Sequence, residues 1–399
     1  MKPILISGAG LSGLLLARSL RRHSIPFEIF ERDAHMAVRG QGYRIRISTD
    51  GLNALRGVLT STEFDTFHAG TSTTGGGGMH ALEATTGEQK QGGPSLGGGA
   101  PQKGPPHGAP GPKLGGDVVG VARGFLRGEL LKGLEDKIHF NKAVKGYEKT
   151  GEGVVALFAD GTKSPEGALL VGADGIHSAI TGQLTDGKVK VYDTGARMIH
   201  GQTKASAYNE LGNGVWAVSD DKSVPGSSLA LITNVRPGSL ETPDLELGWV
   251  FVGSPGSFDA PNGDFSVMGK VAADISRDLT TKWHPKLRKM FTEQNDAEAA
   301  FLKMTTSRPE GIPEWQNDPR VTIMGDSVHA MTPAGGVGAN TALRDAELLG
   351  RLIAEAQGWK EGMTKSFETE MREYASENVK MSYESAAGRF KFQELKALR

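Results

Sequence analysis

Residues 4–13 read Ile-Leu-Ile-Ser-Gly-Ala-Gly-Leu-Ser-Gly, and this stretch decides how the chain folds. A short apolar run of strand type leads into three glycines spaced G-x-G-x-x-G, and apolar residues then recur at helical spacing as far as Leu20. A second strand-type run over residues 26–30 ends at Glu31. Strand, glycine turn, helix, second strand and terminal acid in this order indicate a dinucleotide-binding βαβ unit.

Each part of this motif has a physical role in holding a dinucleotide. Gly8 lets the chain reverse sharply, Gly10 lets a pyrophosphate approach bare backbone, and Gly13 lets the helix pack closely against the strand. The start of the helix offers N–H groups and partial positive charge to phosphates. Glu31 can accept hydrogen bonds from the hydroxyls of an adenosine ribose. The residues expected to bind the cofactor here are Gly8, Gly10, Leu11, Ser12, Gly13, Glu31 and Arg32.

The composition excludes several other classes of protein. The 399 residues carry a formal net charge of -1, so no excess of charge favours nucleic acid or an anionic membrane. The absence of cysteine excludes disulfides, thiolate metal sites and a cysteine nucleophile, and the histidines show no metal-ligand spacing. Glycines interrupt the first apolar run, which argues against a secretory signal, and no run approaches the roughly 18 residues of a membrane span. We expect a cytoplasmic protein without a metal.

Two stretches in the first third of the chain have alternative interpretations. In residues 43–47, apolar residues alternate with Arg44 and Arg46, as in a strand with one apolar and one cationic face. These cations either approach a bound cofactor or lie in solvent. Residues 71–116 are rich in glycine and proline and poor in large apolar residues, so we expect a flexible insert. A G-x-S-x-G match at residues 93–97 lacks the strand and helix that a nucleophilic serine requires, and we interpret it as chance.

The remaining chain predicts a second sheet and then a return to the first. A buried-strand run over residues 168–171 leads into Gly-Ala-Asp-Gly at 172–175. Residues 188–310 contain short β-type runs separated by turn residues, which favours a mainly antiparallel sheet. A last buried-strand run over residues 321–324 precedes a glycine-rich stretch that ends near Asn340, and a helix and a polar helical tail follow.

Three separated motifs carry a resemblance to a known family: residues 8–13 with Glu31 and Arg32, residues 172–175 with Ser178, and residues 325–340. In this order they resemble the single-component FAD-dependent aromatic hydroxylases of the para-hydroxybenzoate and salicylate hydroxylase type. The resemblance implies an α/β fold with a Rossmann-like FAD-binding domain, an inserted, mainly antiparallel substrate domain and a C-terminal helical tail. We expect the FAD-binding domain at 1–70, 117–185 and 318–345, the flexible insert at 71–116, the substrate-binding domain at 186–317 and the helical segment at 346–399.

The resemblance also implies roles for individual residues. Arg39 and Arg123 would lie along the FAD, Asp174 near its pyrophosphate and Asp326 at the ribityl chain. His329 would support the loop after Asp326, with a catalytic role as the alternative. The loop that approaches the isoalloxazine ring would contain Pro333, Gly336, Gly338, Ala339 and Asn340. The second sheet would cover the flavin, and the substrate candidates are Arg46, Arg197, His200 and Trp216, although aromatic residues on a sheet more often belong to the core.

The activity implied is that of an FAD-dependent monooxygenase. NADPH or NADH would act as a transient co-substrate, because the chain has no second glycine motif of this kind. Reaction with O2 would give a flavin C4a-hydroperoxide, whose distal oxygen passes to an aromatic or polycyclic, secondary-metabolite-like small molecule. The protein would be a monomer or homodimer, and no catalytic residue is assigned.

Two features of the sequence leave other functions open. Thr181 stands where the family usually has an arginine, three residues after Ser178, and this bears on nicotinamide binding. The glycine-rich insert occupies a region that is ordered in the family. The alternatives are a halogenase-like or reductase-dependent flavoprotein, although the W-x-W-x-I-P element is absent, and a catalytically degenerate FAD-binding protein.

Overall fold

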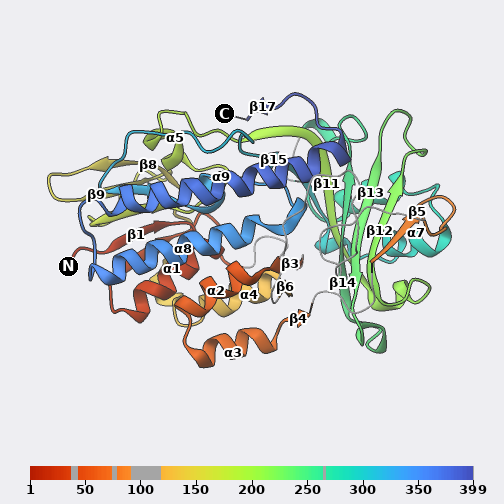
Figure 1. Ribbon diagram of the computed structural model, residues 1–399, viewed down its shortest axis with the longest axis horizontal. Helices are drawn as coiled ribbons and strands as arrows, with labels where there is room; N and C mark the ends of the chain where they lie inside the picture. Colours follow the sequence, from red (N-terminus) through yellow and green to blue (C-terminus); the bar gives the residue numbers. More distant parts are fainter. Residues whose placement is uncertain (37–43, 74–78, 91–117, 264–266, 399) are drawn as a thin grey trace, which may run out of the picture.

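The computed structural model of the chain describes residues 1–36, 44–73, 79–90, 118–263 and 267–398. Two large sheets lie side by side, the smaller one with its helices on the left of Figure 1 and the larger one on the right. The first is parallel and the second is mainly antiparallel. The α/β fold class predicted from the sequence is therefore confirmed.

The parallel sheet is built from the apolar runs of the sequence. Its strand order is β16-β10-β1-β2-β7, and all of its pairs are parallel. Its central strands are buried along their whole length, as the continuous apolar runs at 4–6 and 169–171 require. The strands are β1 (Ile4–Ser7), β2 (Phe27–Phe30), β7 (Ile138–His139), β10 (Leu169–Gly172) and β16 (Val321–Ile323).

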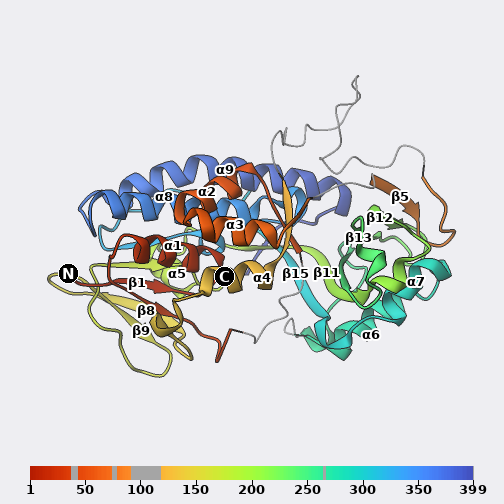
Figure 2. The ribbon, with the colours of Figure 1, turned by 90° about the horizontal axis from the view of Figure 1, so that it is seen from below.

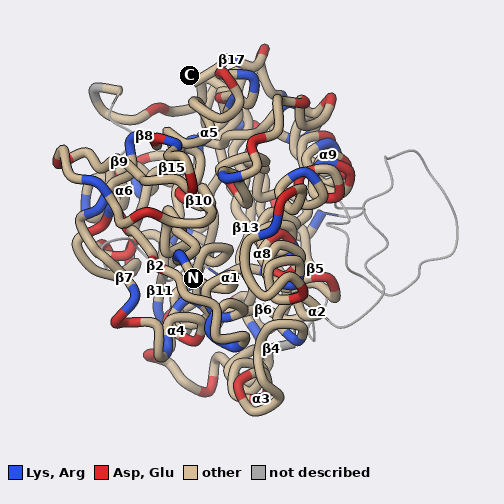
Figure 3. The backbone as a smooth tube through the Cα atoms, turned by 90° about the vertical axis from the view of Figure 1, so that its left-hand side faces the viewer, with Lys and Arg blue, Asp and Glu red and all other residues tan. Residues whose placement is uncertain are grey.

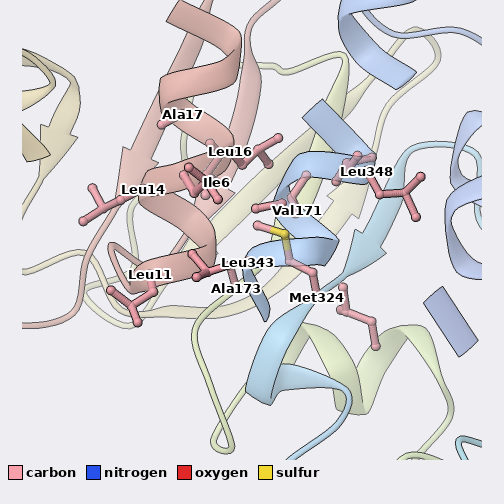
Figure 4. Close-up of a cluster of buried hydrophobic side chains, with 14 of the residues drawn as sticks. Ile6, Leu11, Leu14, Leu16, Ala17, Val171, Ala173, Met324, Leu343 and Leu348 are labelled. Atoms are coloured by element: carbon pink, nitrogen blue, oxygen red, sulfur yellow. The ribbon is translucent and has the colours of Figure 1, made fainter. Parts of the chain in front are cut away.

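Helices α1 (Leu11–Arg22) and α8 (Gly338–Glu355) pack against each other beside this sheet. Figure 4 shows their common core, in which Ile6 and Val171 of the strands lie near Leu14 of α1 and Leu343 of α8. Helix α9 (Met363–Phe390) runs alongside α8, and Figures 1 and 2 both show the pair crossing most of the molecule. The other helices of this half are α2 (Thr49–Val58), α3 (Ser61–Ala69), α4 (Arg123–Leu131) and α5 (Ala179–Leu184).

The larger sheet has the strand order β15-β11-β14-β13-β12-β5, and β17 also pairs with β11. One of its faces packs on α6 (Lys270–Leu279) and α7 (Pro285–Thr292) through a core that contains Trp249 and Phe291. The strands are β5 (Met79–Glu83), β11 (Tyr192–Lys204), β12 (Gly214–Asp220), β13 (Leu229–Val235), β14 (Glu246–Gly253), β15 (Ala300–Thr306) and β17 (Lys396–Ala397).

Two small sheets complete the described structure. Strand β3 (Arg44–Ile47) pairs with β6 (Val119–Ala122), which also pairs with β4 (Ser72–Thr73). The arginine-containing run is thus a strand, as its alternation predicts. Strands β8 (Val144–Lys149) and β9 (Val154–Phe158) form a hairpin-like pair.

The structure differs from the sequence-based expectation in the segment predicted to be flexible. Residues 79–83 form β5, which pairs in parallel with β12, and a turn follows. Main-chain hydrogen bonds to the edge of β12 and burial of Leu82 and Ala84 fix this part, so the prediction of flexibility is wrong for residues 79–90. Residues 74–78 and 91–117, including the G-x-S-x-G match, lie outside the described residues.

The C-terminal region differs in two details from a purely helical tail. Helix α8 runs without a break through residue 345, where the sequence suggested a domain boundary. Helix α9 ends at Phe390, because the following Lys391 takes a left-handed conformation with φ of 50°. The chain then forms β17, which pairs with Tyr192 and Asp193 of β11. The last residues of the described chain are therefore part of the larger sheet.

Lysine and arginine are mixed with aspartate and glutamate over the face shown in Figure 3. Among the helices of the described residues, none is both long and apolar enough to cross a membrane. Within the same ranges, no group of three histidine, aspartate or glutamate side chains could hold a metal ion.

Candidate cofactor site

The three sequence motifs converge at one edge of the parallel sheet. Strands β1, β10 and β16 are parallel neighbours, and each of the motifs follows the carboxyl end of one of them. Ligands of open α/β sheets bind outside this edge. Side chains join the motifs directly: the Ser7 hydroxyl donates to Asp174 at 2.9 Å, and Gly175 N–H donates to the Ser327 hydroxyl at 2.9 Å. The tertiary structure therefore assembles one candidate site from distant segments.

The glycines of the first motif have different surroundings. Gly8 has φ of 103°, and a Cβ there would lie 2.5 Å from the carbonyl oxygen of Ala173. A Cβ at Gly13 would overlap the carbonyl oxygen of Gly8. A Cβ at Gly10, in contrast, would find no atom of the described residues closer than 3.9 Å. Gly8 and Gly13 are thus needed for close packing of the backbone. Gly10, in contrast, leaves space beside the backbone.

Helix α1 begins beside that space. Gly10 is its N-cap, no side chain of the described residues caps it, and its first turn has no acidic residue. The N–H groups of such a turn and the helix dipole favour a phosphate. Leu11 and Ser12, the first two helical residues, are themselves buried.

Glu31 stands at the end of β2, next to the glycine turn. It is 6% exposed, accepts a hydrogen bond from Ala9 N–H at 2.9 Å and another from Asp33 N–H at 3.0 Å. Each carboxylate oxygen retains a second lone pair for a ligand hydroxyl. The neighbouring Arg32 is exposed, and its Nε lies 4.0 Å from Asp33 Oδ1. Arg39 lies outside the described residues.

Arg127 is a residue of this site that the sequence analysis did not single out. It is buried on α4, its Nε donates to the Ala9 carbonyl at 2.9 Å, and its Nη2 lies 3.7 Å from Glu31 Oε2. It therefore fixes the glycine turn and compensates the charge of the buried carboxylate. The arginine spacing in residues 121–127 was visible in the sequence, but Arg123 was the one expected at the cofactor.

The second and third motifs place two carboxylates at this edge. Burial raises the pKa of Asp174, and the hydrogen bonds from serine hydroxyls oppose that rise. Asp326 is exposed, and Gly325 before it lies against Ser12 of α1. The charges of His329 and Arg123 act on this exposed carboxylate. Arg123 is thus close enough for its charge to influence Asp326, and the roles of both residues at the cofactor stay predictions.

The loop before α8 has the conformation that its glycines allow. Gly335 and Gly336 have φ of 79° and 63°, and Gly338 is the first residue of α8. Pro333 is exposed, and Gly336, Gly338 and Ala339 are partly exposed. The first turn of α8 has no acidic residue and no side-chain cap among the described residues, so its N–H groups can face a ligand.

Asn340 is buried and connects this loop to β3. Its Oδ1 accepts from Ser48 N–H at 2.9 Å, and its Nδ2 donates to the carbonyls of Arg46 at 3.0 Å and Gly336 at 2.7 Å. These bonds occupy both amide hydrogens. Asn340 therefore holds the loop in place, and any contribution to cofactor binding is through the loop's shape.

We expect Gly51→Ala to disturb this loop from outside the site. Alanine normally stabilises a helix interior by about 1 kcal/mol relative to glycine. A Cβ at Gly51 in α2 would instead overlap Asn340 Oδ1 and lie 2.9 Å from Ile47 Cγ2. We expect a net loss of about 1–3 kcal/mol in the free energy of unfolding, measured by urea denaturation. Gly128→Ala in α4, where a Cβ meets nothing within 4 Å, is the control and should be neutral or stabilising.

The structure does not bring the four candidate substrate-binding residues together at one site. Arg46 packs beside Gly336, and His200 is buried on β11. Arg197 is held in ion pairs with Asp193 and Asp259, both at 2.8 Å. Trp216 stacks on His80 and packs against the core under α6 and α7, so it lies on the face of the sheet away from the glycine loop.

The residues at this edge fit an FAD. The open space at Gly10, the two helix starts without side-chain caps and the buried Glu31 supply complementary groups for a pyrophosphate, a flavin and a ribose. A metal requires a different donor set. The roles of the individual cofactor-binding residues stay predictions.

Comparisons with known proteins find FAD-binding and FAD-dependent proteins similar to this chain. The family described as FAD binding domain matches residues 273–382. The dual O-methyltransferase/FAD-dependent monooxygenase elcB of Phaeosphaeria nodorum is 34% identical over 88% of this chain, and the chain spans 40% of elcB. The FAD-dependent monooxygenase thnD of Trichoderma harzianum is 26% identical, with 96% of this chain and 90% of thnD covered. A putative FAD-containing monooxygenase from Photorhabdus luminescens subsp. laumondii has a similar structure, with a TM-score of 0.74, 25% identity and coverage of 98% and 99%.

The fold and the site together resemble those of FAD-binding flavoproteins. Within that class, the chain is a relative of the FAD-dependent monooxygenases, which confirms the resemblance to the aromatic hydroxylases.

Proposed function

We propose that this chain is an FAD-dependent monooxygenase that uses NADPH or NADH and O2 to insert one oxygen atom into an aromatic or polycyclic small molecule. The observation that carries the proposal is the convergence of the three motifs, with open space at Gly10, beside two helix starts that lack side-chain caps. The names of the relatives support the reaction class. A cytoplasmic location and a monomeric or homodimeric state remain predictions.

The chain's own residues would bind and orient the cofactor. The start of α1 would hold the pyrophosphate, Glu31 the adenosine ribose and Asp326 the ribityl hydroxyls, with Arg123 beside it. The start of α8 would present N–H groups and a positive dipole end to the flavin ring. When bound, FAD supplies the redox and oxygen chemistry, whereas the protein supplies position, electrostatics and exclusion of water.

The substrate would lie between the glycine loop and the larger sheet. Ala334 of the loop packs in one cluster with Met198 and Val252, so the loop meets the face of the sheet opposite α6 and α7. His200 is two residues after Met198 on the same strand and faces the same side. Burial lowers the pKa of His200 to about 4, so its imidazole is neutral and can exchange hydrogen bonds with a phenol. We propose His200 and Arg46 as the substrate contacts. Trp216 is not among them, because it lies on the opposite face of the sheet.

The test is anaerobic reduction of the FAD-loaded protein by NADPH and by NADH, followed in the visible flavin bands. We expect bleaching that particular phenols or polycyclic aromatics accelerate by about tenfold or more, because substrate docking completes the site. Oxygenated product should then form in air. A flavin that binds but is never bleached by either nucleotide would contradict the proposal and favour a reductase-dependent or degenerate flavoprotein.

A further inference from the structure

A buried polar network lies directly behind the third motif. His329 and Asp345 are both fully buried, with His329 Nε2 at 2.6 Å from Asp345 Oδ2. The Tyr374 hydroxyl donates to Asp345 Oδ1 at 2.7 Å, and Gly325 N–H donates to Asp345 Oδ2 at 2.7 Å. A single carboxylate thus takes part in three hydrogen bonds, two with the turn at residues 325–329 and one with α9.

The network connects the cofactor edge to the C-terminal helices. Gly325 and His329 flank Asp326, Asp345 belongs to α8, and Tyr374 belongs to α9. His329 N–H also donates to the Gly325 carbonyl at 3.0 Å, so the two ends of the turn around Asp326 are tied together. The network therefore fixes the backbone turn that carries Asp326.

The charges in this network are arranged around the imidazole. Burial opposes protonation of His329, but the Asp345 carboxylate, with a smaller contribution from Asp326, raises the pKa of His329 above its usual value. The charged and titratable groups around the network include the Tyr374 hydroxyl, the Arg344 guanidinium at 3.7 Å from the centre of the Tyr374 ring, and Glu370, whose charge acts on Tyr374. Burial and Asp345 raise the pKa of Tyr374 far out of the physiological range, so this hydroxyl remains a donor.

We propose that His329 is a positioning residue for FAD, held by Asp345 and Tyr374 as a buried imidazolium that orients Asp326 and offsets its negative charge. The inference rests on the proposed binding of FAD at this edge and adds a role for α9, whose Tyr374 holds Asp345. Loss of the imidazolium leaves Asp326 and Asp345 as two carboxylates without a charge between them. FAD affinity should then fall by about tenfold.

The dependence on pH follows from the raised pKa of His329. The ion pair is complete below the ordinary imidazole range and is lost as the pH rises through the raised value. FAD binding by the unaltered protein should therefore weaken as the pH rises through the raised pKa of His329. Tyr374→Phe removes one hydrogen bond from Asp345, which concentrates negative charge near His329 and should move this transition to higher pH.

The experiment measures the dissociation constant of FAD by flavin fluorescence from pH 6 to pH 9. We expect His329→Gln to bind about tenfold more weakly at pH 6 and to lose the pH transition, since glutamine can bond to Asp345 but carries no charge. Tyr374→Phe should retain a transition, shifted upward. Tyr383→Phe, on the same helix but outside the network, is the control and should behave as the unaltered protein.

The outcomes separate this inference from the proposed function. An unaltered protein that does not bind FAD at any pH contradicts the proposed function. Normal FAD binding with the same pH profile in His329→Gln overturns the role of His329, and an unshifted transition in Tyr374→Phe overturns the role of α9. Thermal unfolding of each apoprotein identifies a variant that fails to fold, and Tyr374→Phe, which removes a single oxygen atom, then carries the test.

Discussion

Gly13→Ala is expected to lower the free energy of unfolding by about 3 kcal/mol and to abolish FAD binding. Gly13 lies inside α1, where alanine would normally stabilise the helix by about 1 kcal/mol. Here a Cβ would overlap the carbonyl oxygen of Gly8, which is backbone and cannot rotate away. Helix α1 would have to shift away from the turn, and this shift would disturb the packing of its buried residues. Urea denaturation and flavin fluorescence measure the two effects.

Gly10→Ala is the matched control for this prediction. Gly10 has φ of -77° and ψ of -175°, which alanine adopts without strain, and its Cβ would meet no described atom within 3.9 Å. We expect this variant to keep its stability within about 1 kcal/mol but to bind FAD at least tenfold more weakly, because the methyl group occupies the space of the pyrophosphate. Equal stability of the two variants would contradict the different roles assigned to these glycines.

Glu31→Ala should have the second largest effect on the free energy of unfolding and on FAD affinity. It removes the acceptor of two backbone N–H groups, at Ala9 and Asp33, and leaves the buried Arg127 without its nearby carboxylate. Buried groups that lose their partners cost about 2–3 kcal/mol in stability. FAD affinity should fall about 100-fold, because the ribose loses its acceptor and the glycine turn loses its anchor.

Glu28→Ala is the control for Glu31. Glu28 is on the same strand, but it is partly exposed and pairs with His139 at 2.7 Å on the surface. Exposed pairs contribute at most about 1 kcal/mol, so stability and FAD affinity should change little. The role of Glu31 would be refuted if its alanine variant bound FAD with the affinity of the Glu28 variant.

Much of the cofactor half of this protein was predictable from local sequence. The G-x-G-x-x-G spacing, the buried-strand runs at 4–6, 169–171 and 321–323 and the acid at 31 are short-range patterns whose backbone geometry leaves few alternatives. Family resemblance placed Asp174, Asp326 and the loop before Asn340 at one site. The structure places these motifs at one edge of the sheet, as parallel strands require.

Other features depend on contacts between residues far apart in the chain. Asp345 and Tyr374 carry no recognisable motif, because their role arises only where α8 and α9 meet behind the turn at Asp326. Trp216 was indistinguishable from a substrate contact until the pairing register showed which face of the sheet it occupies. Glycine-rich composition also concealed β5, since an edge strand is stabilised by the hydrogen bonds of its neighbour β12 rather than by its own side chains.

One physical cause explains why some features were predictable from the sequence and others were not. Glycine conformation, strand periodicity and helix starts are properties of a few consecutive residues, so the nucleotide-binding unit was recognisable before any packing was known. Buried hydrogen bonds, pKa shifts and the face that a strand presents depend on what packs against a residue. The roles of Arg127, His329 and Tyr374 accordingly emerged only once distant segments were in contact.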